Sequence, residues 1–312
     1  MEESNHLRLN HGLNSLYPFS KGSVVTLGNF DGVHLGHQQV IKQLVKAAHA
    51  RHLPSVLLTF EPSPKEFLSL QAPARLTSIR EKITHLQTTQ LEHMVYLQFN
   101  ESLSKLPAEQ FIEEILVSRL NVQCILVGRD FRFGYQRQGD ITLLKQVGRR
   151  KGFEVILIDD VVIEGTRVSS TAIRSALKIG DFSLAKTMLG RSYTILGRVA
   201  QGDQRGRQIG FPTANIPLKR LISPLHGVYA VRVYGITSQG LPAVANVGQR
   251  PTVNGNKFLL EAHIFDFQAN IYGQHLCVEF LKKIRDEERF ASFDLLRQQI
   301  MRDAEQAKEF FK

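Results

Sequence analysis

The first 160 residues alternate between two hydrophobic patterns. Short apolar runs rich in β-branched residues, which are typical of strands, are separated by segments whose apolar residues recur every three or four positions, as in an amphipathic helix. Strands that alternate with helices predict parallel βαβ units, and therefore an open parallel sheet covered by helices on both faces. The expected strands are residues 23–28, 55–59, 93–97, 123–128 and 154–158.

The pattern changes after about residue 190. Two short helical stretches, 170–179 and 181–189, end in Gly180 and Gly190. Short alternating runs then dominate, interrupted by glycine and proline, which predicts a small antiparallel β-barrel. A last helix is expected at residues 292–311. We therefore expect an α/β domain with an open parallel sheet at residues 1–187, followed by a small antiparallel β-barrel with a C-terminal helix at residues 188–312.

Composition excludes several classes of protein. With 312 residues, 43% of them hydrophobic and 22% charged, the chain has the make-up of an ordinary globular protein with room for two domains. The longest uncharged run, residues 233–249, is broken by Gly235, Gly240 and Pro242, so we expect no membrane span. The N-terminus lacks the apolar core of a secretory signal. Cys124 and Cys277 lie inside apolar runs, which favours a reduced, cytoplasmic protein.

The net charge of +10 raises the question of a nucleic-acid partner. A barrel that binds single strands needs exposed aromatic residues interleaved with basic ones on its strands. The expected barrel strands carry mainly Val, Ile, Leu and Ala, and no block of five basic residues occurs. Small anionic ligands such as nucleoside phosphates fit the dispersed charge as well as a polymer does, so the charge alone leaves both open. The strand composition argues against nucleic acid, we expect no membrane partner, and the oligomeric state stays open.

The first strand runs directly into residues 28–37, GNFDGVHLGH, and then into a helix. Glycines at such a turn let the backbone approach a phosphate, and the helix N-terminus presents free N–H groups. His34 and His37 lie three residues apart, so both rings project from one face of the first helical turn. Two imidazoles there can stabilise the charge that develops on a phosphate under attack. The alternative is two surface histidines beside a turn.

This turn resembles the GxFDxxHxGH motif of the nucleotidyltransferase superfamily, which implies a Rossmann-like fold. Residues 167–174, RVSSTAIR, resemble the second motif of the superfamily, a hydroxyl-rich helix start suited to the β- and γ-phosphates of ATP. Helix capping is the alternative for Ser169 and Ser170. The resemblance implies catalytic roles for His34 and His37 and an ATP site made of Gly28, Asn29, Phe30, Asp31, His34, His37, Arg167, Ser169, Ser170, Thr171 and Arg174.

Two further segments indicate one particular family within this superfamily. Residues 59–64, TFEPSP, and 127–134, VGRDFRFG, each close a strand and resemble the flavin-facing loops of prokaryotic FAD synthetases. Ligands of open α/β sheets bind at the carboxyl ends of the strands. The resemblance implies flavin contacts by Phe60, Asp130 and Phe131. Packing in the core is the alternative for each phenylalanine, Phe133 included.

Residues 197–215, GRVAQGDQRGRQIGFPTAN, resemble the riboflavin kinase motif. Without the family, its spaced glycines indicate only a mobile hairpin. Thr213 and Asn215 alternate onto one side of an extended chain, where a hydroxyl and an amide oxygen can hold Mg²⁺ together with ATP oxygens. The resemblance implies an ATP site made of Gly202, Gly206, Arg207, Gly210, Phe211, Pro212, Thr213 and Asn215, the last two being the metal ligands.

Glu261 interrupts an apolar strand pattern. We expect it to point into the barrel, where a carboxylate is costly unless it has a function. The alternative is an edge-strand residue that faces water. The resemblance places the catalytic base of the kinase at this glutamate.

The resemblance extends from about residue 23 to the C-terminus and implies a bifunctional enzyme of flavin synthesis. The C-terminal domain converts riboflavin and Mg²⁺-ATP to FMN and ADP, and the N-terminal domain converts FMN and ATP to FAD and pyrophosphate. The alternative is a monofunctional FMN adenylyltransferase whose barrel only binds flavin. The intact PTAN segment and Glu261 argue against that alternative.

Overall fold

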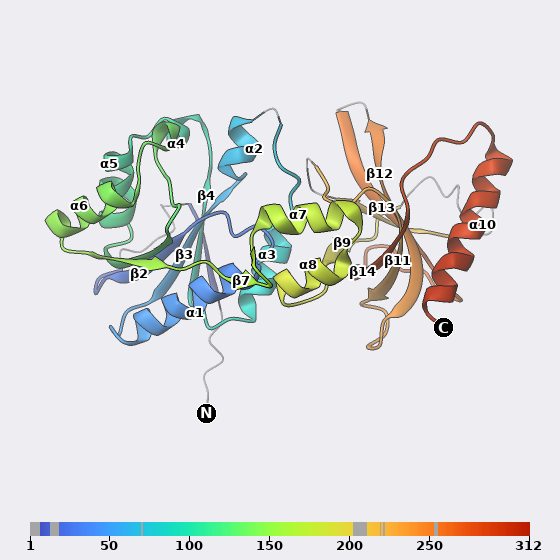
Figure 1. The fold of residues 1–312 in the computed structure, drawn as a ribbon, viewed down its shortest axis with the longest axis horizontal. Coiled ribbons are helices and arrows are strands. Elements are labelled where there is room, and N and C mark those ends of the chain that lie inside the picture. The colour runs from blue at the N-terminus through green and yellow to red at the C-terminus, as the bar shows by residue number, and fades with distance from the viewer. Residues whose placement is uncertain are drawn as a thin grey trace. The chain divides into compact units, whose positions relative to one another are not determined.

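The computed structural model of this chain describes residues 7–12, 19–69, 71–201, 211–218, 220, 222–252 and 255–312. They form two compact units (Figure 1). The first unit is Met1–Pro73 with Lys82–Val168, and the second is Ala74–Glu81 with Ser169–Lys312. This division by packing is separate from the functional boundary expected between residues 187 and 188, which stays a prediction.

A six-stranded sheet forms the centre of the first unit. Its order is β1-β4-β3-β2-β5-β6, and every neighbouring pair is parallel. The five expected strands are confirmed as β2 to β6, whereas β1 was not expected because its sequence, RLNH, has no apolar run. The strands are β1 Arg8–His11, β2 Ser23–Leu27, β3 Ser55–Glu61, β4 His93–Gln98, β5 Val122–Gly128 and β6 Glu154–Ile158.

Helices cover both faces of this sheet (Figure 1). Helix α1, Leu35–His49, packs on one face through Ile41, Leu44, Val45 and Ala48, the positions that the periodicity marks as apolar. The other face carries α6, Ile141–Lys151, and the π-helical segment η2, Phe111–Val117. The shorter elements are α2 Pro64–Leu68, α4 Glu101–Ser104, α5 Ala108–Gln110, the 3₁₀ turn η3 Tyr135–Arg137, and the ribbon of β7 Val162–Ile163 and β8 Thr166–Arg167.

The second unit contains the expected antiparallel barrel. Its strand order is β10-β13-β12-β11-β14-β9. The two ends of this order meet where the Ala200 amide donates to the Asn215 carbonyl at 2.7 Å. The strands are β9 Thr194–Arg198, β10 Ala214–Leu218, β11 Gly227–Tyr234, β12 Leu241–Thr252, β13 Gly255–Ile264 and β14 His275–Arg285.

Successive residues of the barrel strands point alternately into the barrel and toward its outer face. Tyr229 and Phe280 are fully buried inside, where their rings meet edge to face at 5.3 Å, and Phe182 packs against both. Phe182 opens α8, Phe182–Leu189, which follows α7, Ser170–Ile179. The outer face carries the expected C-terminal helix, α10 Phe293–Phe310, whose Ala304 and Ala307 pack with buried residues of β11 and β12.

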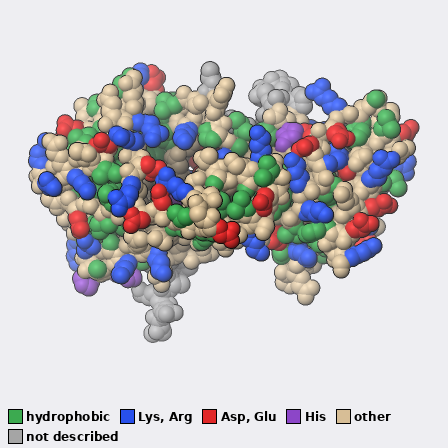
Figure 2. Space-filling view, viewed as in Figure 1, with side chains coloured by type: hydrophobic (Ala, Val, Ile, Leu, Met, Phe, Trp, Pro, Cys, Tyr) green, Lys and Arg blue, Asp and Glu red, His purple; other side chains and the backbone are tan. Residues whose placement is uncertain are grey.

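The surface carries both signs of charge. On the face drawn in Figure 2, basic and acidic side chains are interspersed. The excess of positive charge is therefore dispersed on this face, as the sequence indicates. Within the residues that the structure describes, no helix is both long and apolar enough to cross a bilayer.

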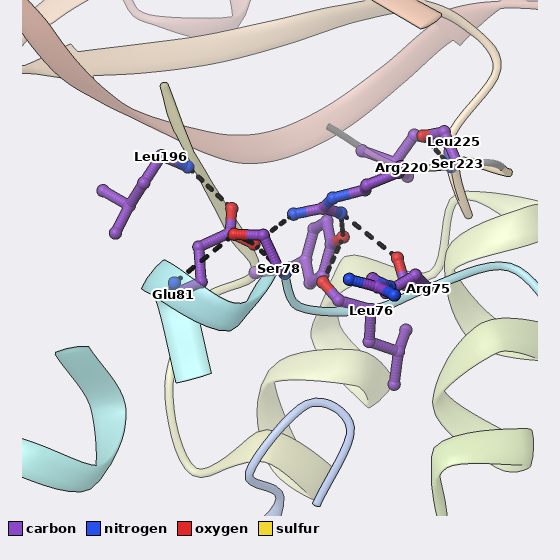
Figure 3. Close-up of polar contacts among 9 residues, drawn as sticks. Arg75, Leu76, Ser78, Glu81, Leu196, Arg220, Ser223 and Leu225 are labelled. Atoms are coloured by element: carbon purple, nitrogen blue, oxygen red, sulfur yellow. Dashed lines mark hydrogen bonds and ion pairs between the residues drawn. The ribbon is translucent and has the colours of Figure 1, made fainter. Parts of the chain in front are cut away.

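A buried ion pair holds residues 74–81 within the second unit (Figure 3). The side chains of Glu81 and Arg220 are 1% and 2% exposed, and Arg220 Nη2 donates to Glu81 Oε2. The same carboxylate oxygen accepts from the Ser78 amide at 2.6 Å, and Oε1 accepts from the Leu196 amide at 2.8 Å. Glu81 thus caps the start of α3, Ile79–Gln87, and links residues 74–81 to β9 within the second unit.

Arg220 has further partners in the same network. Its Nη1 donates to the Tyr193 hydroxyl at 2.7 Å and to the Arg75 carbonyl at 3.3 Å. The Tyr193 hydroxyl in turn donates to the Leu76 carbonyl at 2.9 Å. Burial alone lowers the pKa of Arg220, but Tyr193 and Glu81 outweigh it, so the net shift is upward and the guanidinium stays charged.

We predict that this pair is strongly coupled. Removing one member of a buried ion pair leaves an uncompensated charge and costs about 3–5 kcal/mol. Arg220→Met should therefore lower the free energy of unfolding by that amount, and adding Glu81→Gln should restore part of it. Urea unfolding of the two single variants and the double variant measures the coupling. Additive losses would show that the two side chains contribute independently.

Candidate active sites

The turn between β2 and α1 has an unusual backbone. Phe30 and Val33 have φ values of +46° and +41°, the left-handed region that non-glycine residues rarely adopt. A Cβ at Gly36 would lie 3.2 Å from the His34 ring. Glycine at this position therefore lets the imidazole lie close against the first turn of α1.

The two histidines of this turn lie against each other. Their rings are stacked, with centroids 3.6 Å apart and an angle of 18° between the planes, and the Phe30 ring lies 4.8 Å from His37. His34 is the N-cap of α1, where its Nδ1 accepts from the His37 amide at 3.3 Å. An accepting Nδ1 places the proton of a neutral ring on Nε2, which is then a donor. The rings share one face, as expected, while their chemical role stays a prediction.

A buried lysine lies behind the same turn. Lys82 is 5% exposed, and its Nζ donates to the Asn29 carbonyl at 2.6 Å and to Thr59 Oγ1 at 3.3 Å. Sequence reasoning did not single it out. No local pattern marks it, because its partners Asn29 and Thr59 lie 53 and 23 positions away in the sequence.

The expected flavin-facing phenylalanines lie in and against the core. Phe60 is 9% exposed and belongs to the main hydrophobic cluster of the first unit, and Phe131 packs against that cluster. Phe131 and Phe133 stack at 5.4 Å, and Phe133 contacts Phe111. Core packing, the alternative for these rings, is therefore observed, and the flavin contacts of Phe60 and Phe131 stay predictions.

Asp130 and Arg167 meet although they are 37 positions apart. Arg167 Nη2 donates to Asp130 Oδ2 at 2.9 Å and pairs with Asp160 Oδ1 at 2.8 Å. The hydrogen bond to Asp130, followed by the charges of both carboxylates, raises the pKa of Arg167. Arg167, which we expect to contact a phosphate of ATP, is thus bound by Asp130, which we expect to contact the flavin.

The hydroxyl-rich helix start belongs to the second unit, unlike Arg167. Ser169 is the N-cap of α7 and accepts from the Ala172 amide at 3.2 Å, so the capping alternative is observed for Ser169. Ser170 and Thr171 form the first turn. Arg174 donates through Nε to the Ala74 carbonyl at 2.5 Å.

In the barrel, a cavity of about 430 Å³ contains part of the expected kinase site. Four of the expected residues, Gly202, Gly206, Arg207 and Gly210, lie outside the described residues. Phe211 is half-buried, with its ring 5.0 Å from that of His263. The cavity is lined by Val199, Pro212, Thr213, Ala214, Asn215, Ala262, Ile264, Phe267, Gln268, Ala269, Asn270, Ile271 and Tyr272.

Glu261 lies in the middle of a polar row that crosses three strands. In register it pairs with Asn215 of β10 and Asn246 of β12, so the three side chains share one face. Its side chain is 21% exposed, and Arg250 Nη2 donates to its Oε2 at 2.7 Å. Asn246 and Arg250 were not identified from the sequence, because only the strand pairing brings them to Glu261.

The expected orientation of Glu261 is wrong. Its neighbours Leu260 and Ala262 are fully buried and take the inward positions, so Glu261 faces the outer side of the wall. Asn246 pairs with Val228, which packs with α10 on that same side. The edge-strand alternative is also wrong, since β13 lies between β10 and β12.

The expected magnesium ligands suit this ion. Asn215 Nδ2 donates to the Thr213 carbonyl at 3.3 Å, which orients the amide, and both residues line the cavity. A hydroxyl and an amide oxygen beside a carboxylate form an oxygen-only donor set, which Mg²⁺ prefers. No group of three His, Cys, Asp or Glu side chains suited to a metal occurs among the described residues.

The two units thus define the class of protein before any comparison. A parallel α/β unit with paired histidines at a strand-to-helix turn is typical of nucleotidyl transfer, and a barrel with a cavity lined by both polar and apolar residues and a strand carboxylate suits phosphoryl transfer. Residues 17–172 match the family model described as FAD synthetase, and residues 189–311 match the model described as riboflavin kinase. The chain belongs to the family of bifunctional riboflavin kinases/FMN adenylyltransferases.

Individual relatives agree with this membership. The bifunctional riboflavin kinase/FMN adenylyltransferase of Escherichia coli is 46% identical over 93% of both chains. The enzyme of the same description from Haemophilus influenzae is 45% identical over 98% of this chain and 99% of its own length. A crystal structure from Streptococcus pneumoniae, described as a macrolide-efflux protein, has a TM-score of 0.75 at 33% identity, covering 95% of this chain and 97% of the other.

We predict that neither cysteine acts as a nucleophile. Burial raises the pKa of the Cys124 thiol to about 11 and also raises that of Cys277. At pH 8 only about one Cys124 thiol in a thousand is then ionised. In a Cys277→Ser variant, the labelling of Cys124 by a thiol reagent should be slow at pH 8 and should accelerate as the pH rises toward 11. Rapid labelling of the folded variant at pH 8 would contradict this.

Proposed function

We propose that this chain carries out both reactions of its family. The riboflavin 5′-hydroxyl attacks the γ-phosphorus of ATP to give FMN and ADP, and an FMN phosphate oxygen attacks the α-phosphorus of a second ATP to give FAD and pyrophosphate. The observation that carries this proposal is that one chain has both the stacked His34–His37 pair in its first unit and the Glu261 row in its second. A monofunctional adenylyltransferase would not need that row.

In the kinase step, Glu261 accepts the proton of the riboflavin hydroxyl. Arg250 holds one carboxylate oxygen, which orients the other. Thr213 and Asn215 hold Mg²⁺, which when bound neutralises charge on the transferred phosphate. The ATP contacts of Gly202, Gly206, Arg207 and Gly210 belong to the same proposal, as do those of Phe211 and Pro212, beside the cavity.

In the adenylyl transfer step, the histidines donate hydrogen bonds to the α-phosphate as its negative charge grows. The tautomer of His34 supports this role, because its Nε2 carries the proton. Gly28 to Asp31 shape the turn. Ser169, Ser170 and Thr171, at the positive end of the α7 dipole, bind the outer phosphates together with Arg167 and Arg174. Phe60, Asp130 and Phe131 contact the flavin.

The location and partners of the chain are part of the same proposal. Two thiols that take part in no disulfide support a reducing compartment, and we propose the cytoplasm. The match to the FAD synthetase and riboflavin kinase family models supports small substrates such as riboflavin, FMN and ATP as partners, and we propose that nucleic acid is not one.

The kinase role of Glu261 is tested with Glu261→Gln. The amide keeps the size of the side chain but cannot accept the hydroxyl proton, so FMN formation from riboflavin should fall about 10²- to 10⁴-fold. FAD formation from supplied FMN should remain at the parental rate. Glu279→Gln is the matched control, because Glu279 is a half-buried strand glutamate bound to the Tyr234 hydroxyl. Chromatography of the flavins gives both rates, and near-parental FMN formation by Glu261→Gln would remove the base from the mechanism.

The histidines are tested with variants chosen from the cap geometry. His34→Asn keeps a good N-cap but lacks the Nε2 donor, so the start of α1 should remain intact. His34→Asn and His37→Ala should each lower FAD formation about 10²- to 10³-fold and leave FMN formation unchanged. His49→Ala, at the exposed end of α1, is the control. Parental FAD formation in both test variants would exclude the histidines from the chemistry.

A further inference from the structure

Lys82 is a buried basic side chain that contacts the turn at residues 28–37, and the proposed mechanism does not use it. Its ammonium is placed 2.6 Å from the Asn29 carbonyl oxygen, and the residue is 5% exposed. A buried ammonium loses its hydration and is costly unless the protein supplies partners. A lysine at this buried position is therefore expected to hold another group of the protein in place.

The contact fixes a particular peptide. The Asn29 carbonyl and the Phe30 amide belong to the same planar group, so holding the oxygen sets the direction of the Phe30 N–H. Phe30 has a φ of +46°, a conformation that persists only where neighbouring groups impose it. Thr59 Oγ1, which is fully buried, donates to the same carbonyl at 3.4 Å and accepts from Lys82 at 3.3 Å.

We propose that Lys82 is a positioning residue for adenylyl transfer, which holds the Asn29–Phe30 peptide so that the turn is preformed for the phosphates of ATP. Its positive charge also lies behind a turn that must receive a polyanion, which strengthens the attraction. The side chain acts through the backbone and does not touch the nucleotide. This inference rests on the proposed adenylyl transfer of the first unit.

The primary test is Lys82→Met in the full-length chain. Methionine keeps the length of the apolar stem and removes the ammonium. Misplacing a group that positions substrate costs up to about 100-fold in rate, so kcat/KM for FAD formation should fall about 10- to 100-fold, with a several-fold rise of the KM for Mg²⁺-ATP. The KM for FMN and the rate of riboflavin phosphorylation should remain parental. Lys42→Met, at an exposed position of α1, is the matched control for loss of a lysine charge.

Two further variants keep the test decisive if Lys82→Met folds poorly in a thermal melt. Thr59→Val has the same shape but lacks the hydroxyl, so it should raise the KM for Mg²⁺-ATP in the same direction and by less. Lys82→Arg keeps a charged donor and should recover part of the loss. Parental KM for Mg²⁺-ATP in Thr59→Val and in any folded Lys82→Met overturns the proposal, and so does a loss confined to the KM for FMN.

The parent protein separates this proposal from the function on which it rests. If the parent forms no FAD from FMN and Mg²⁺-ATP, the proposed adenylyl transfer itself is wrong. If the parent forms FAD and the Lys82 and Thr59 variants match it, only the positioning role is wrong.

Discussion

The ion pair between Arg220 and Glu81 shows the constraint on which much of this structure depends, namely that a buried charge must be met by partners. Arg220 contacts Glu81, Tyr193 and the Arg75 carbonyl, and Glu81 also receives the amides of Ser78 and Leu196. Three of these bonds join residues more than 100 positions apart, namely those from Arg220 to Glu81 and to the Arg75 carbonyl and that from the Leu196 amide to Glu81. The barrel unit therefore includes an eight-residue segment, Ala74–Glu81, that is remote from it in sequence.

The next residue, Lys82, is also a buried charge that needs partners, but its partners lie in the other unit. Lys82 follows Glu81 directly, yet its ammonium serves the first unit, where it meets the Asn29 carbonyl and the Thr59 hydroxyl. Adjacent buried charges on one helix thus satisfy different networks. One network stabilises the attachment of a segment to the barrel unit, and the other shapes the turn where we place adenylyl transfer.

In the barrel wall, strand alternation decides what a polar residue can do. Leu260 and Ala262 fill the interior, and Glu261 between them is turned to the outer face, where Asn215 and Asn246 flank it and Arg250 binds it. A carboxylate inside the barrel would have no room for a substrate. On the outer face it is half-buried and paired with Arg250, which is compatible with the proposed role as general base.

The sequence by itself determined the local features of this protein. Its hydrophobic periods predicted five of the six parallel strands, the glycine-terminated helices α7 and α8, and the C-terminal helix, because burial of one face repeats at the period of the element. The two segments that we expect to bind phosphate, residues 28–37 and 197–215, stood out in the sequence because their residues are contiguous, and their phosphate binding stays a prediction. The tertiary structure alone decided the strand orders, the pairing of β1 with β4, the partners of Arg220, the face of Glu261 and the burial of Lys82. Each of these features depends on contacts between residues that are distant in the sequence. The local period of hydrophobic residues shows which positions are buried, but it does not show which distant residues they contact.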